Sequence, residues 1–389
     1  SGSGQQHGSV YLKPGFDTVL GRLDPSQRLV ENLGGVFSRA TAPIWQDSST
    51  SVECGEIGNA LGGMLATAAA TGSIAIERFT GPQVRRFFKQ DPQAYERTGH
   101  VALVSSILAS VLAGRVADIY PGDGAGMNLM DIGRKTWLPE ALEATAPGLG
   151  AKLPSISPSW SVIGNVSAYF VAKYGLAPDA KCLVWSGDNP NSVVGLGLIQ
   201  PGMAAISLGT SDTFIGTMEA CRTDPLGEGH VFGSPADGYM SLICLTNGSL
   251  ARERVKDEYA LDWDGFSRAL ADTRPGNGGA MMLPYFVPET VPKVLNPKVH
   301  RSDLDPADAA ANCRAVVESQ MMALRLHSEW MGIRPERMYA TGGASANAAI
   351  LQVMADVHRS PVYRSEVTNS AGLGAALRAA HGYLEDAGT

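Results

Sequence analysis

The stretch from residue 182 to residue 218 constrains the fold of this chain more than any other. Cys182–Trp185 is a short apolar run, and Gly187 ends it. Such a run predicts a buried strand that carries Asp188 at its end. Pro190 and Gly195 then break the backbone. One carboxylate is therefore expected where a buried strand gives way to a loop.

A hairpin is predicted next. Ala204–Leu208 and Thr213–Gly216 read as strands, and Gly209-Thr210-Ser211-Asp212 reads as a tight turn between them. Such a turn can direct several backbone N–H groups and two hydroxyl groups at one point, which suits a phosphate group.

A carboxylate at a strand end, followed by a turn that can bind phosphate, is a sensible arrangement for phosphoryl transfer. The carboxylate would accept the proton of the acceptor hydroxyl, and the turn would hold the phosphates of the donor. Spacing alone leaves a structural interpretation open, because Asp at a strand end is often a cap or turn former, and Gly-Thr-Ser is often only a hairpin turn.

Motifs along the chain resemble one family of enzymes. Gly187-Asp188-Asn189-Pro190, followed by Ser207-Leu208-Gly209-Thr210-Ser211-Asp212, resembles the FGGY carbohydrate kinases, and most closely the eukaryotic-type xylulose kinases. Four further segments continue the resemblance in the family's order: Gly4-Gln5-Gln6-His7-Gly8-Ser9, Trp45-Gln46-Asp47-Ser48-Ser49, Glu77-Arg78-Phe79-Thr80-Gly81 and Ala340-Thr341-Gly342-Gly343-Ala344-Ser345-Ala346-Asn347. The resemblance therefore covers nearly the whole chain.

The resemblance implies a fold and a reaction. The fold is α/β, with two ribonuclease H-like (actin-like ATPase) domains and a cleft between them. Residues 1–190 are expected to form the sugar-binding domain and residues 191–389 the nucleotide-binding domain. The reaction is the transfer of the γ-phosphoryl group of MgATP to the terminal hydroxyl of D-xylulose. ATP and Mg²⁺ are therefore the expected cofactors, and a sugar is the expected small-molecule partner.

The resemblance also implies roles for individual residues. Asp188 would be the general base, for which a carboxylate of near-normal pKa suffices if the transition state is loose. By matching position, the sugar would be held by His7, Arg78, Asp188 and Asn189, the phosphates would face Gly209 and Thr210, and the nucleotide would be held by Trp263, Gly342, Gly343, Ala344 and Asn347. No metal ligand is assigned.

Several of these residues have a structural alternative. His7 on its own reads as a surface loop histidine. Arg78 could simply pair with Glu77 or Glu96, although a guanidinium also suits fixed hydroxyls or phosphate oxygens. Trp263 could be a half-buried structural residue.

Hydrophobic patterning predicts the remaining elements. A strand at Met338–Thr341, two glycines and a helix from Asn347 to Val357 make a good nucleotide platform, although an ordinary β–α turn looks the same. Other helices are predicted over Val52–Thr71, Gly81–Gln90, Val101–Ala113 and 305–329, with two or three more in 137–175 and a loop at Gly122–Gly126.

Composition bounds the class of protein. A chain of 389 residues is long enough for two domains. Its formal net charge of −7 gives no basic footprint for nucleic acid and no polybasic patch for a membrane. The five dispersed cysteines read as reduced residues of a cytoplasmic protein. We expect a monomer or a homodimer.

The first residues predict an incomplete first domain. Ser1-Gly2-Ser3-Gly4 could be a linker, but Gly4 belongs to the family-like loop. The family's opening strand–turn–strand, with its Asp-x-Gly-Thr/Ser motif, is expected upstream of this loop. Because that hairpin contacts phosphate in relatives, we expect this chain to be weak or inactive as a kinase.

Two alternatives to xylulose phosphorylation remain open. One is a kinase of another ketose or polyol, such as ribulose, and the other is a non-catalytic sugar-binding module derived from a kinase. Competing motifs fail: Gly133-Arg134-Lys135-Thr136 misses the P-loop pattern, Gly195 and Gly197 lack the third glycine of a Rossmann fingerprint, and the seven histidines show no zinc-binding motif.

Overall fold

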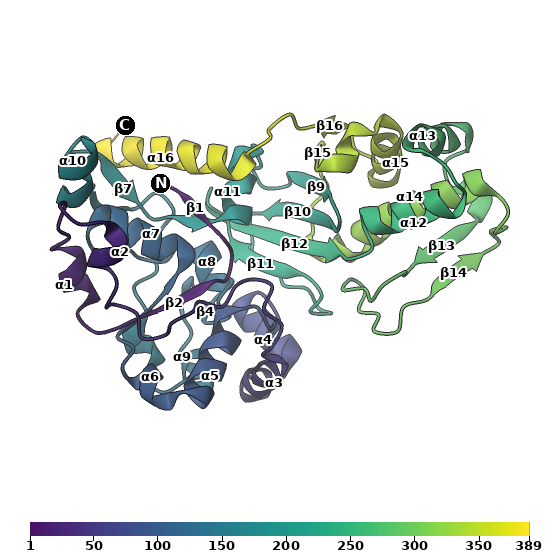
Figure 1. Ribbon diagram of the computed structural model, residues 1–389. Coiled ribbons are helices and arrows are strands. Elements are labelled where there is room, and N and C mark those ends of the chain that lie inside the picture. The colour runs from purple at the N-terminus through teal and green to yellow at the C-terminus, as the bar shows by residue number, and fades with distance from the viewer. Residues whose placement is uncertain (389) are drawn as a thin grey trace. The chain divides into compact units, whose positions relative to one another are not determined.

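A computed structural model describes residues 1–388 of the chain. The chain divides into two compact units. Unit 1 comprises residues 1–199, 231–239 and the segment from Thr368 onwards, and unit 2 comprises residues 200–230 and 240–367. Unit 1 therefore runs past residue 190 and regains the chain at its C-terminal helix (Figure 1).

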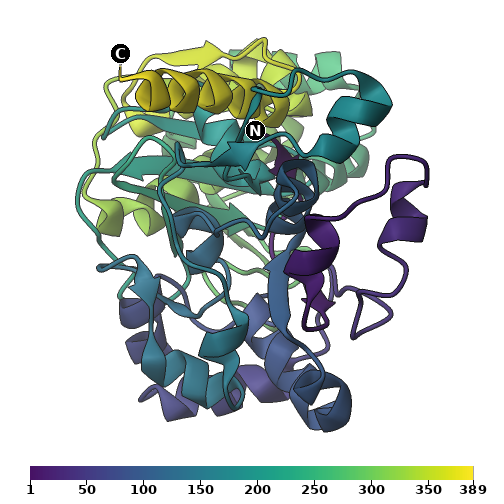
Figure 2. The same ribbon diagram turned by 90° about the vertical axis from the view of Figure 1, so that its left-hand side faces the viewer.

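Unit 1 combines short strands with many helices (Figure 2). Its strands are β1 (Ser3–Gly4), β2 (Ser9–Leu12), β3 (His100–Leu103), β4 (Met130–Asp131), β5 (Thr136–Trp137), β6 (Val162–Asn165), β7 (Lys181–Leu183), β8 (Ser186–Gly187) and β11 (His230–Gly233). Its helices are α1 (Phe16–Leu20), α2 (Leu29–Asn32), α3 (Ser51–Ala60), α4 (Met64–Thr71), α5 (Thr80–Gln90), α6 (Pro92–Glu96), α7 (Val104–Ala113), α8 (Pro121–Ala125), α9 (Pro139–Thr145), η1 (Leu149–Lys152), α10 (Ala168–Tyr174), α11 (Asp188–Gly195) and α16 (Ser370–Ala387).

Short strand pairs join distant segments of unit 1. β1 pairs with β8 in parallel, with Ser3 opposite Ser186 and Gly4 opposite Gly187. β2 pairs with β3 and β6 with β7, both antiparallel. In a parallel pair both strands end at the same edge. The residues that follow β1 and β8 therefore emerge side by side.

Two helices of unit 1 cross with almost no space between their backbones. A Cβ added at Gly195 of α11 would overlap the carbonyl of Ser370, and one added at Gly374 of α16 would overlap the carbonyl of Asn191. Glycine permits this close approach because it has no side chain. Figure 1 shows α16, in yellow, running along α11, β1 and β7.

The core of unit 1 is aromatic near its first strands. Tyr11 and Phe87 lie with ring centroids 4.5 Å apart, and Phe87 meets Tyr95 edge-on at 6.3 Å. Val101 and Leu103 of β3 are buried in the same cluster. Burying such side chains stabilises a fold by about 1.5–3 kcal/mol each. This cluster holds β2, which begins two residues after His7, and its partner β3 in place.

Three predictions for unit 1 are wrong in part. The helix predicted over Val52–Thr71 is interrupted between α3 and α4, because Gly62 and Gly63 have φ values of 87° and 110°. The helix predicted over Val101–Ala113 begins only at α7, because the preceding residues pair as β3 with β2. Gly122–Gly126 is not a loop, because its first four residues lie in α8, which has proline at its first position.

Unit 2 holds a larger sheet with helices around it. Its strands are β9 (Ala204–Leu208), β10 (Asp212–Met218), β12 (Tyr239–Leu245), β13 (Met281–Pro284), β14 (Val299–Ser302), β15 (Met338–Thr341) and β16 (Val362–Arg364). Its helices are α12 (Ser249–Glu258), α13 (Trp263–Asp272), η2 (Asn277–Gly279), α14 (Ala309–His327), η3 (Glu329–Met331), η4 (Gly343–Ala346) and α15 (Ala348–His358).

In the larger sheet the strands of unit 2 follow one another in the order β12-β10-β9-β15-β16, whereas β13 and β14 form a separate antiparallel pair. β9 pairs antiparallel with β10 and parallel with β15, so that Ser207 lies opposite both Thr213 and Thr341. The predictions of strands at Ala204–Leu208 and Met338–Thr341 are confirmed. The predicted turn is one residue shorter than expected, because Asp212 already belongs to β10.

Helix α14 begins later than the sequence pattern suggests. It starts at Ala309 rather than at Asp305, because Asp308 is its N-cap and accepts a hydrogen bond from the N–H of Ala311 at 2.9 Å. Val316, Val317, Met321 and Leu324, which follow helical spacing, are buried, whereas Leu326, which follows the same spacing, is 62% exposed. The amphipathic pattern therefore predicts the helix, whereas its first residue is set by the Asp308 cap.

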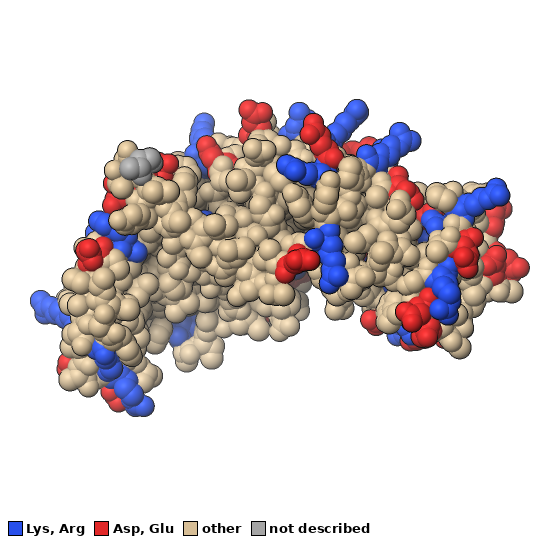
Figure 3. Space-filling view, turned by 90° about the horizontal axis from the view of Figure 1, so that it is seen from above, with Lys and Arg blue, Asp and Glu red and all other residues tan. Residues whose placement is uncertain are grey.

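No helix within residues 1–388 is long and apolar enough to cross a membrane. Figure 3 shows Lys and Arg side chains interspersed with Asp and Glu side chains over the face seen there.

Candidate active site

Two of the predicted sugar-side segments emerge at one edge of unit 1. His7 follows β1, and Asp188 with Asn189 follows β8, its parallel partner. The Gln6 side chain packs against Gly187, where an added Cβ would overlap its amide. Strand pairing and this close contact therefore hold the His7 loop beside the segment that carries Asp188.

His7 is fixed by its backbone, by a hydrogen bond and by an aromatic contact. Its φ of 64° is unusual for a residue with a side chain. Its Nδ1 lies 2.9 Å from the carbonyl oxygen of Gly126. Because a carbonyl can only accept, Nδ1 carries the proton and Nε2 remains an acceptor. The ring centroid also lies 4.5 Å from that of Phe79.

The His7 ring is neutral at ordinary pH. The pKa of His7 is lowered to about 3, chiefly by burial and in smaller part by the positive charge of Arg78, against the opposing effect of the Gly126 hydrogen bond. A neutral imidazole with a fixed acceptor nitrogen is suited to binding a hydroxyl group.

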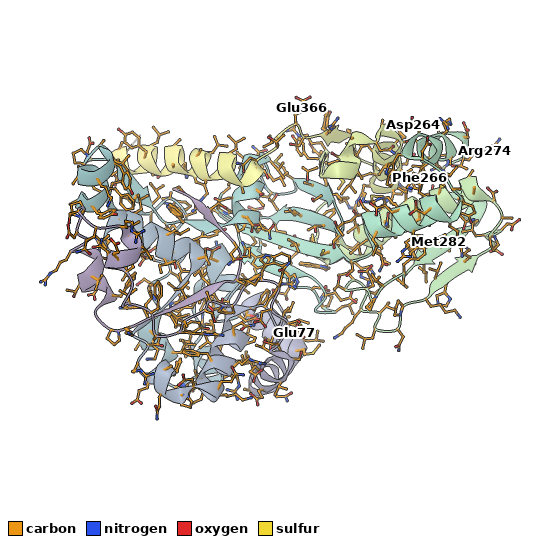
Figure 4. The ribbon with its side chains drawn as sticks, viewed as in Figure 1. Glu77, Asp264, Phe266, Arg274, Met282 and Glu366 are labelled. Carbon is orange, nitrogen blue, oxygen red and sulfur yellow. The ribbon has the colours of Figure 1, made fainter. Side chains whose placement is uncertain are left out.

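Arg78 presents a guanidinium that is available to a ligand. It is half-buried, and among residues 1–388 it forms no hydrogen bond or ion pair. The predicted alternative of a pair with Glu77 or Glu96 is therefore wrong. Glu77, labelled in Figure 4, instead accepts a hydrogen bond from the Ser51 hydroxyl at 3.0 Å.

Asp188 is the first residue of α11 and is exposed, as is Asn189. Its Oδ1 accepts a hydrogen bond from the N–H of Asn189 at 2.9 Å. Partial desolvation raises the pKa of the Asp188 carboxyl above its ordinary value, and the Asn189 N–H opposes that rise. The carboxyl remains open to a reacting hydroxyl and is a better proton acceptor than an ordinary aspartate.

Sequence reasoning missed the importance of Asp123. This residue lies in α8, is 5% exposed, and accepts hydrogen bonds from the N–H of Gly187 at 2.9 Å and the hydroxyl of Ser105 at 2.6 Å. The pKa of Asp123 is raised to about 6, chiefly by burial and least by the charge of Asp188, against the opposing hydrogen bonds from Ser105 and Gly187. Pro121, read as a helix start, would have predicted α8 with an aspartate in its first turn.

The turn between β9 and β10 lies in unit 2, and residues at the start of α12 hold it in place. The N–H of Ser249 donates to the Gly209 carbonyl at 3.0 Å. A Cβ added at Gly248 would lie 2.6 Å from the Asp212 nitrogen and 2.7 Å from the Thr210 carbonyl oxygen, so the start of α12 touches the turn. Thr210 itself is exposed. The turn is therefore rigid and presents one hydroxyl to solvent.

A second glycine segment lies next to this turn. Because β15 is parallel to β9, Gly342 follows β15 at the edge where Gly209 follows β9. Gly342 has φ 82° and ψ 172°, a region essentially restricted to glycine, and an added Cβ would lie 2.6 Å from the Leu208 carbonyl oxygen. Gly343 begins η4, and a Cβ there would meet nothing within 4 Å. Ala344 is half-buried in the same turn.

Trp263 and Asn347 are connected through α13. Trp263 is 41% exposed at the start of that helix and packs edge-on against the buried Phe266, labelled in Figure 4. Lys256 Nζ lies 5.7 Å from the centroid of the Trp263 ring. Asn347 caps α15 by accepting from the N–H of Ala349 at 3.0 Å, and its Nδ2 donates to the Ser267 hydroxyl at 2.8 Å. Asn347, which follows η4, is therefore hydrogen-bonded to α13, the helix that carries the exposed indole of Trp263.

A buried ion pair lies beneath the β9–β10 turn, and sequence reasoning placed Asp212 in the turn instead. Asp212 and Arg252 are both fully buried and form two hydrogen bonds, of 2.6 and 2.9 Å. Arg252 also donates to Gln320 Oε1 at 2.7 Å, and Gln320 donates to the Gly248 carbonyl at 2.8 Å. The network therefore holds Asp212, at the end of the turn, and Gly248, which contacts the turn, in fixed positions.

The two units offer different chemistry. Unit 1 presents a neutral imidazole, a guanidinium and an open carboxylate, which can bind hydroxyl groups and take a proton. Unit 2 presents backbone N–H groups beside two glycine segments, an arrangement that suits phosphate oxygens. Within residues 1–388 no group of three or more His, Cys, Asp and Glu side chains is placed to hold a metal ion.

Comparison with protein families gives two matches. Residues 40–195 match the N-terminal domain of the FGGY family of carbohydrate kinases, and residues 204–383 match its C-terminal domain. Together the two matches cover most of the chain.

Individual relatives agree with this match. The chain is 44% identical to a xylulose kinase of Rattus norvegicus, over 98% of this chain and 72% of that protein, and 44% identical to xylulose kinase 2 of Arabidopsis thaliana, over 99% and 72%. The crystal structure of a xylulose kinase from Bifidobacterium adolescentis superimposes with a TM-score of 0.83 at 22% identity, over 98% of this chain and 80% of that one. At that identity the structure supports the fold, with its two actin-like domains, which confirms the predicted fold class.

Proposed function

Because this chain belongs to the FGGY family of carbohydrate kinases, we propose that it transfers the γ-phosphoryl group of ATP to D-xylulose and yields D-xylulose 5-phosphate. The 44% identity to xylulose kinases over nearly the whole chain carries this proposal. The side chains of unit 1 are those that a polyhydroxylated substrate needs.

Asp188 acts as the general base in this proposal. Its carboxylate accepts the proton of the sugar's terminal hydroxyl as the oxygen attacks the γ-phosphorus. The bond between the γ-phosphorus and the β,γ-bridging oxygen breaks, and ADP leaves with that oxygen. A general base contributes about 10²- to 10⁴-fold to the rate. The exposed position at the start of α11 and the raised pKa of the Asp188 carboxyl support this role.

His7, Arg78 and Asn189 bind the sugar. The acceptor Nε2 of His7 takes a hydrogen bond from one hydroxyl, and the unpaired guanidinium of Arg78 donates to other oxygens. When the sugar is held in this way, it loses most of its translational and rotational freedom on binding. The chemical step then has a smaller entropic barrier.

Unit 2 binds ATP in this proposal. Gly209 and Thr210 face the phosphates, and Gly342, Gly343 and Ala344 let the nucleotide approach the backbone closely. Trp263 offers an exposed aromatic face, and Asn347 holds η4 against α13. Magnesium enters with the substrate as MgATP and neutralises phosphate charge.

The remaining surroundings of the reaction are also proposed. The partners are a small sugar and ATP, with no nucleic acid, and the protein works as a monomer or a homodimer. A cytoplasmic location fits the free thiols of Cys54, Cys182 and Cys313.

The proposal is tested by incubating the chain with MgATP and a panel of sugars: D-xylulose, D-ribulose, D-gluconate and glycerol. Mass spectrometry counts the phosphorylated product, so slow turnover is also detected. The expected result is that D-xylulose gives the most product. A preference for another member of the panel assigns a different kinase specificity. If no compound in the panel gives product above the no-enzyme background, and calorimetry shows that the chain binds D-xylulose, the result favours the non-catalytic module.

A further inference from the structure

Two buried charges of opposite sign lie around the segment that carries Asp188. They belong to Asp123 in α8 and Arg378 in α16, which are 5% and 3% exposed. An unpaired charge in a protein interior is costly, so both must be compensated by their surroundings. Neither side chain has a place in the proposed contacts to sugar or ATP.

Asp123 fixes the peptide that leads into the proposed base. Its Oδ1 accepts a hydrogen bond from the N–H of Gly187, the residue directly before Asp188 and the N-cap of α11. Its Oδ2 accepts from the Ser105 hydroxyl, which holds the carboxylate in one orientation. Asp123 therefore sets where the strand β8 ends and α11 begins.

Arg378 holds the chain on both sides of Asp188. Its Nη2 donates to the Val184 carbonyl at 3.0 Å, before β8. Its Nη1 donates to Asn191 Oδ1 at 2.9 Å, in the first turn of α11. Asn191 is fully buried and also donates to the carbonyl of Gly2, the residue directly before β1, at 3.2 Å, so the same network reaches the segment that leads to His7.

The electrostatics of the two residues are mutually favourable. Burial raises the pKa of Asp123, and the charge of Arg378 opposes this rise. Burial lowers the pKa of Arg378, and the charge of Asp123 opposes this fall. The Tyr120 ring lies 5.4 Å from Arg378 Cζ and contributes a cation–π contact. Each charge thus helps to keep the other ionised inside unit 1.

We propose that Asp123 and Arg378 are positioning residues that hold the β8–α11 junction so that the Asp188 carboxylate meets the sugar hydroxyl in a productive geometry. This inference rests on the proposed role of Asp188 as the base. Misplacing a reacting group by about 1 Å costs on the order of 10²-fold in rate. The effect should therefore appear mainly in kcat, with a smaller rise in KM for the sugar because Asn189 follows Asp188 in the same junction.

The first test compares three variants with the parent chain. Asp123→Ala removes both hydrogen-bond acceptors, and we expect kcat to fall roughly 10²-fold. Asp123→Asn keeps an oxygen that accepts from the Gly187 N–H and should recover most of that loss. Arg378→Lys keeps the positive charge but lacks the planar guanidinium with its paired N–H donors. Its kcat should fall about tenfold. The two conservative variants remain measurable if Asp123→Ala does not fold.

A matched control separates positioning from stability. Arg85 in α5 bonds to Glu56 and to the Ala144 carbonyl, and it also joins elements of unit 1. Arg85→Lys should lower the melting temperature without changing kcat at a temperature where it is folded. Equal losses of kcat for Arg85→Lys and Arg378→Lys would overturn the inference.

The second test repeats Asp123→Ala in an Asp188→Asn background. If Asp123 acts through the base, it causes little further loss of the residual turnover there. The same fold-loss in both backgrounds would overturn the positioning role while leaving the proposed function intact. Full turnover by Asp188→Asn alone would instead overturn the proposed function of Asp188.

Discussion

The β8–α11 junction in unit 1 and the turn after β9 in unit 2 each place proposed ligand-binding groups at the end of a strand, but with groups of different kinds. Each follows a strand whose parallel partner brings a second segment to the same edge: β1 delivers His7 beside Asp188, and β15 delivers Gly342 beside Gly209. In unit 1 the working groups are side chains open to a ligand. In unit 2 they are mainly backbone groups. Buried charged side chains support both sites: Asp123 and Arg378 in unit 1, and Asp212 and Arg252 in unit 2.

The difference reflects the ligands that each segment is proposed to meet. A sugar is neutral and offers hydroxyl groups, so an imidazole, a guanidinium and a carboxylate can each recognise one. A phosphate chain is highly charged and can be held by N–H groups of a rigid turn. Rigidity in unit 2 comes from Asp212 and Arg252, whose side chains are fully buried. Substitutions should therefore damage stability more in unit 2 and binding more in unit 1.

The largest effect on stability is expected from Asp212→Ala. It leaves Arg252 buried without its partner, which costs about 3–5 kcal/mol of the free energy of unfolding. Urea denaturation measures this loss. Asp264→Ala, at an exposed position in the same unit, should stay within about 0.5 kcal/mol of the parent chain. A similar small loss for Asp212→Ala would mean that the ion pair does not support the turn.

A smaller effect is expected from a single methyl group at Gly342. Gly342→Ala forces alanine into a backbone region that is essentially restricted to glycine and brings its Cβ to 2.6 Å from the Leu208 carbonyl oxygen. We expect a loss of about 1–3 kcal/mol in stability and a higher KM for ATP, with KM for the sugar unchanged. Gly276→Ala is the matched control, since Gly276 also has a positive φ (79°) in unit 2, its added Cβ would meet nothing within 4 Å, and it lies outside the proposed nucleotide site. Equal KM values for ATP in both variants would remove this segment from the nucleotide site.

The smallest effect on stability at neutral pH is expected from His7→Asn. Asparagine tolerates the positive φ but lacks the ring, so one hydrogen bond to the sugar is lost and its KM should rise about 3- to 10-fold. An unchanged KM, with ATP binding as internal reference, would show that His7 does not contact the sugar.

The same variant has a pH signature. The pKa of His7 is lowered from 6.5 to about 3 in the folded chain, so between these values the unfolded state binds a proton that the folded state does not. Stability is therefore lost as pH falls, by at most about 2 kcal/mol between pH 7 and pH 5. His7→Asn should lose correspondingly less over this range in urea denaturation. Identical losses in both chains would contradict the buried neutral imidazole.

The sequence predicted some parts of this molecule well, and for clear physical reasons. Strands β9 and β15 were predicted at their observed bounds because short apolar runs ended by glycine leave little choice. The boundaries between elements in unit 1 were harder to predict from the sequence. Val101–Leu103 is as apolar as the helix it precedes, and only its pairing with β2, distant in sequence, makes it a strand.

The buried charges were out of reach for a similar reason. Asp123 and Asp212 each follow residues typical of turns, so turn chemistry explained them locally. Their partners, Arg378 and Arg252, are distant in sequence, and nothing in the local pattern connects them. Motifs thus indicated the groups proposed to contact ligands, whereas the supporting charges could be found only in the folded chain.

The proposed phosphoryl transfer depends most directly on the carboxylate of Asp188, and one comparison tests it. D-xylulose phosphorylation by the parent chain and by Asp188→Asn should be measured side by side, with sugar binding by calorimetry and thermal melting as checks on folding. The account predicts that kcat falls about 10²- to 10⁴-fold while sugar affinity and melting temperature change little. Equal turnover by the two chains would contradict it.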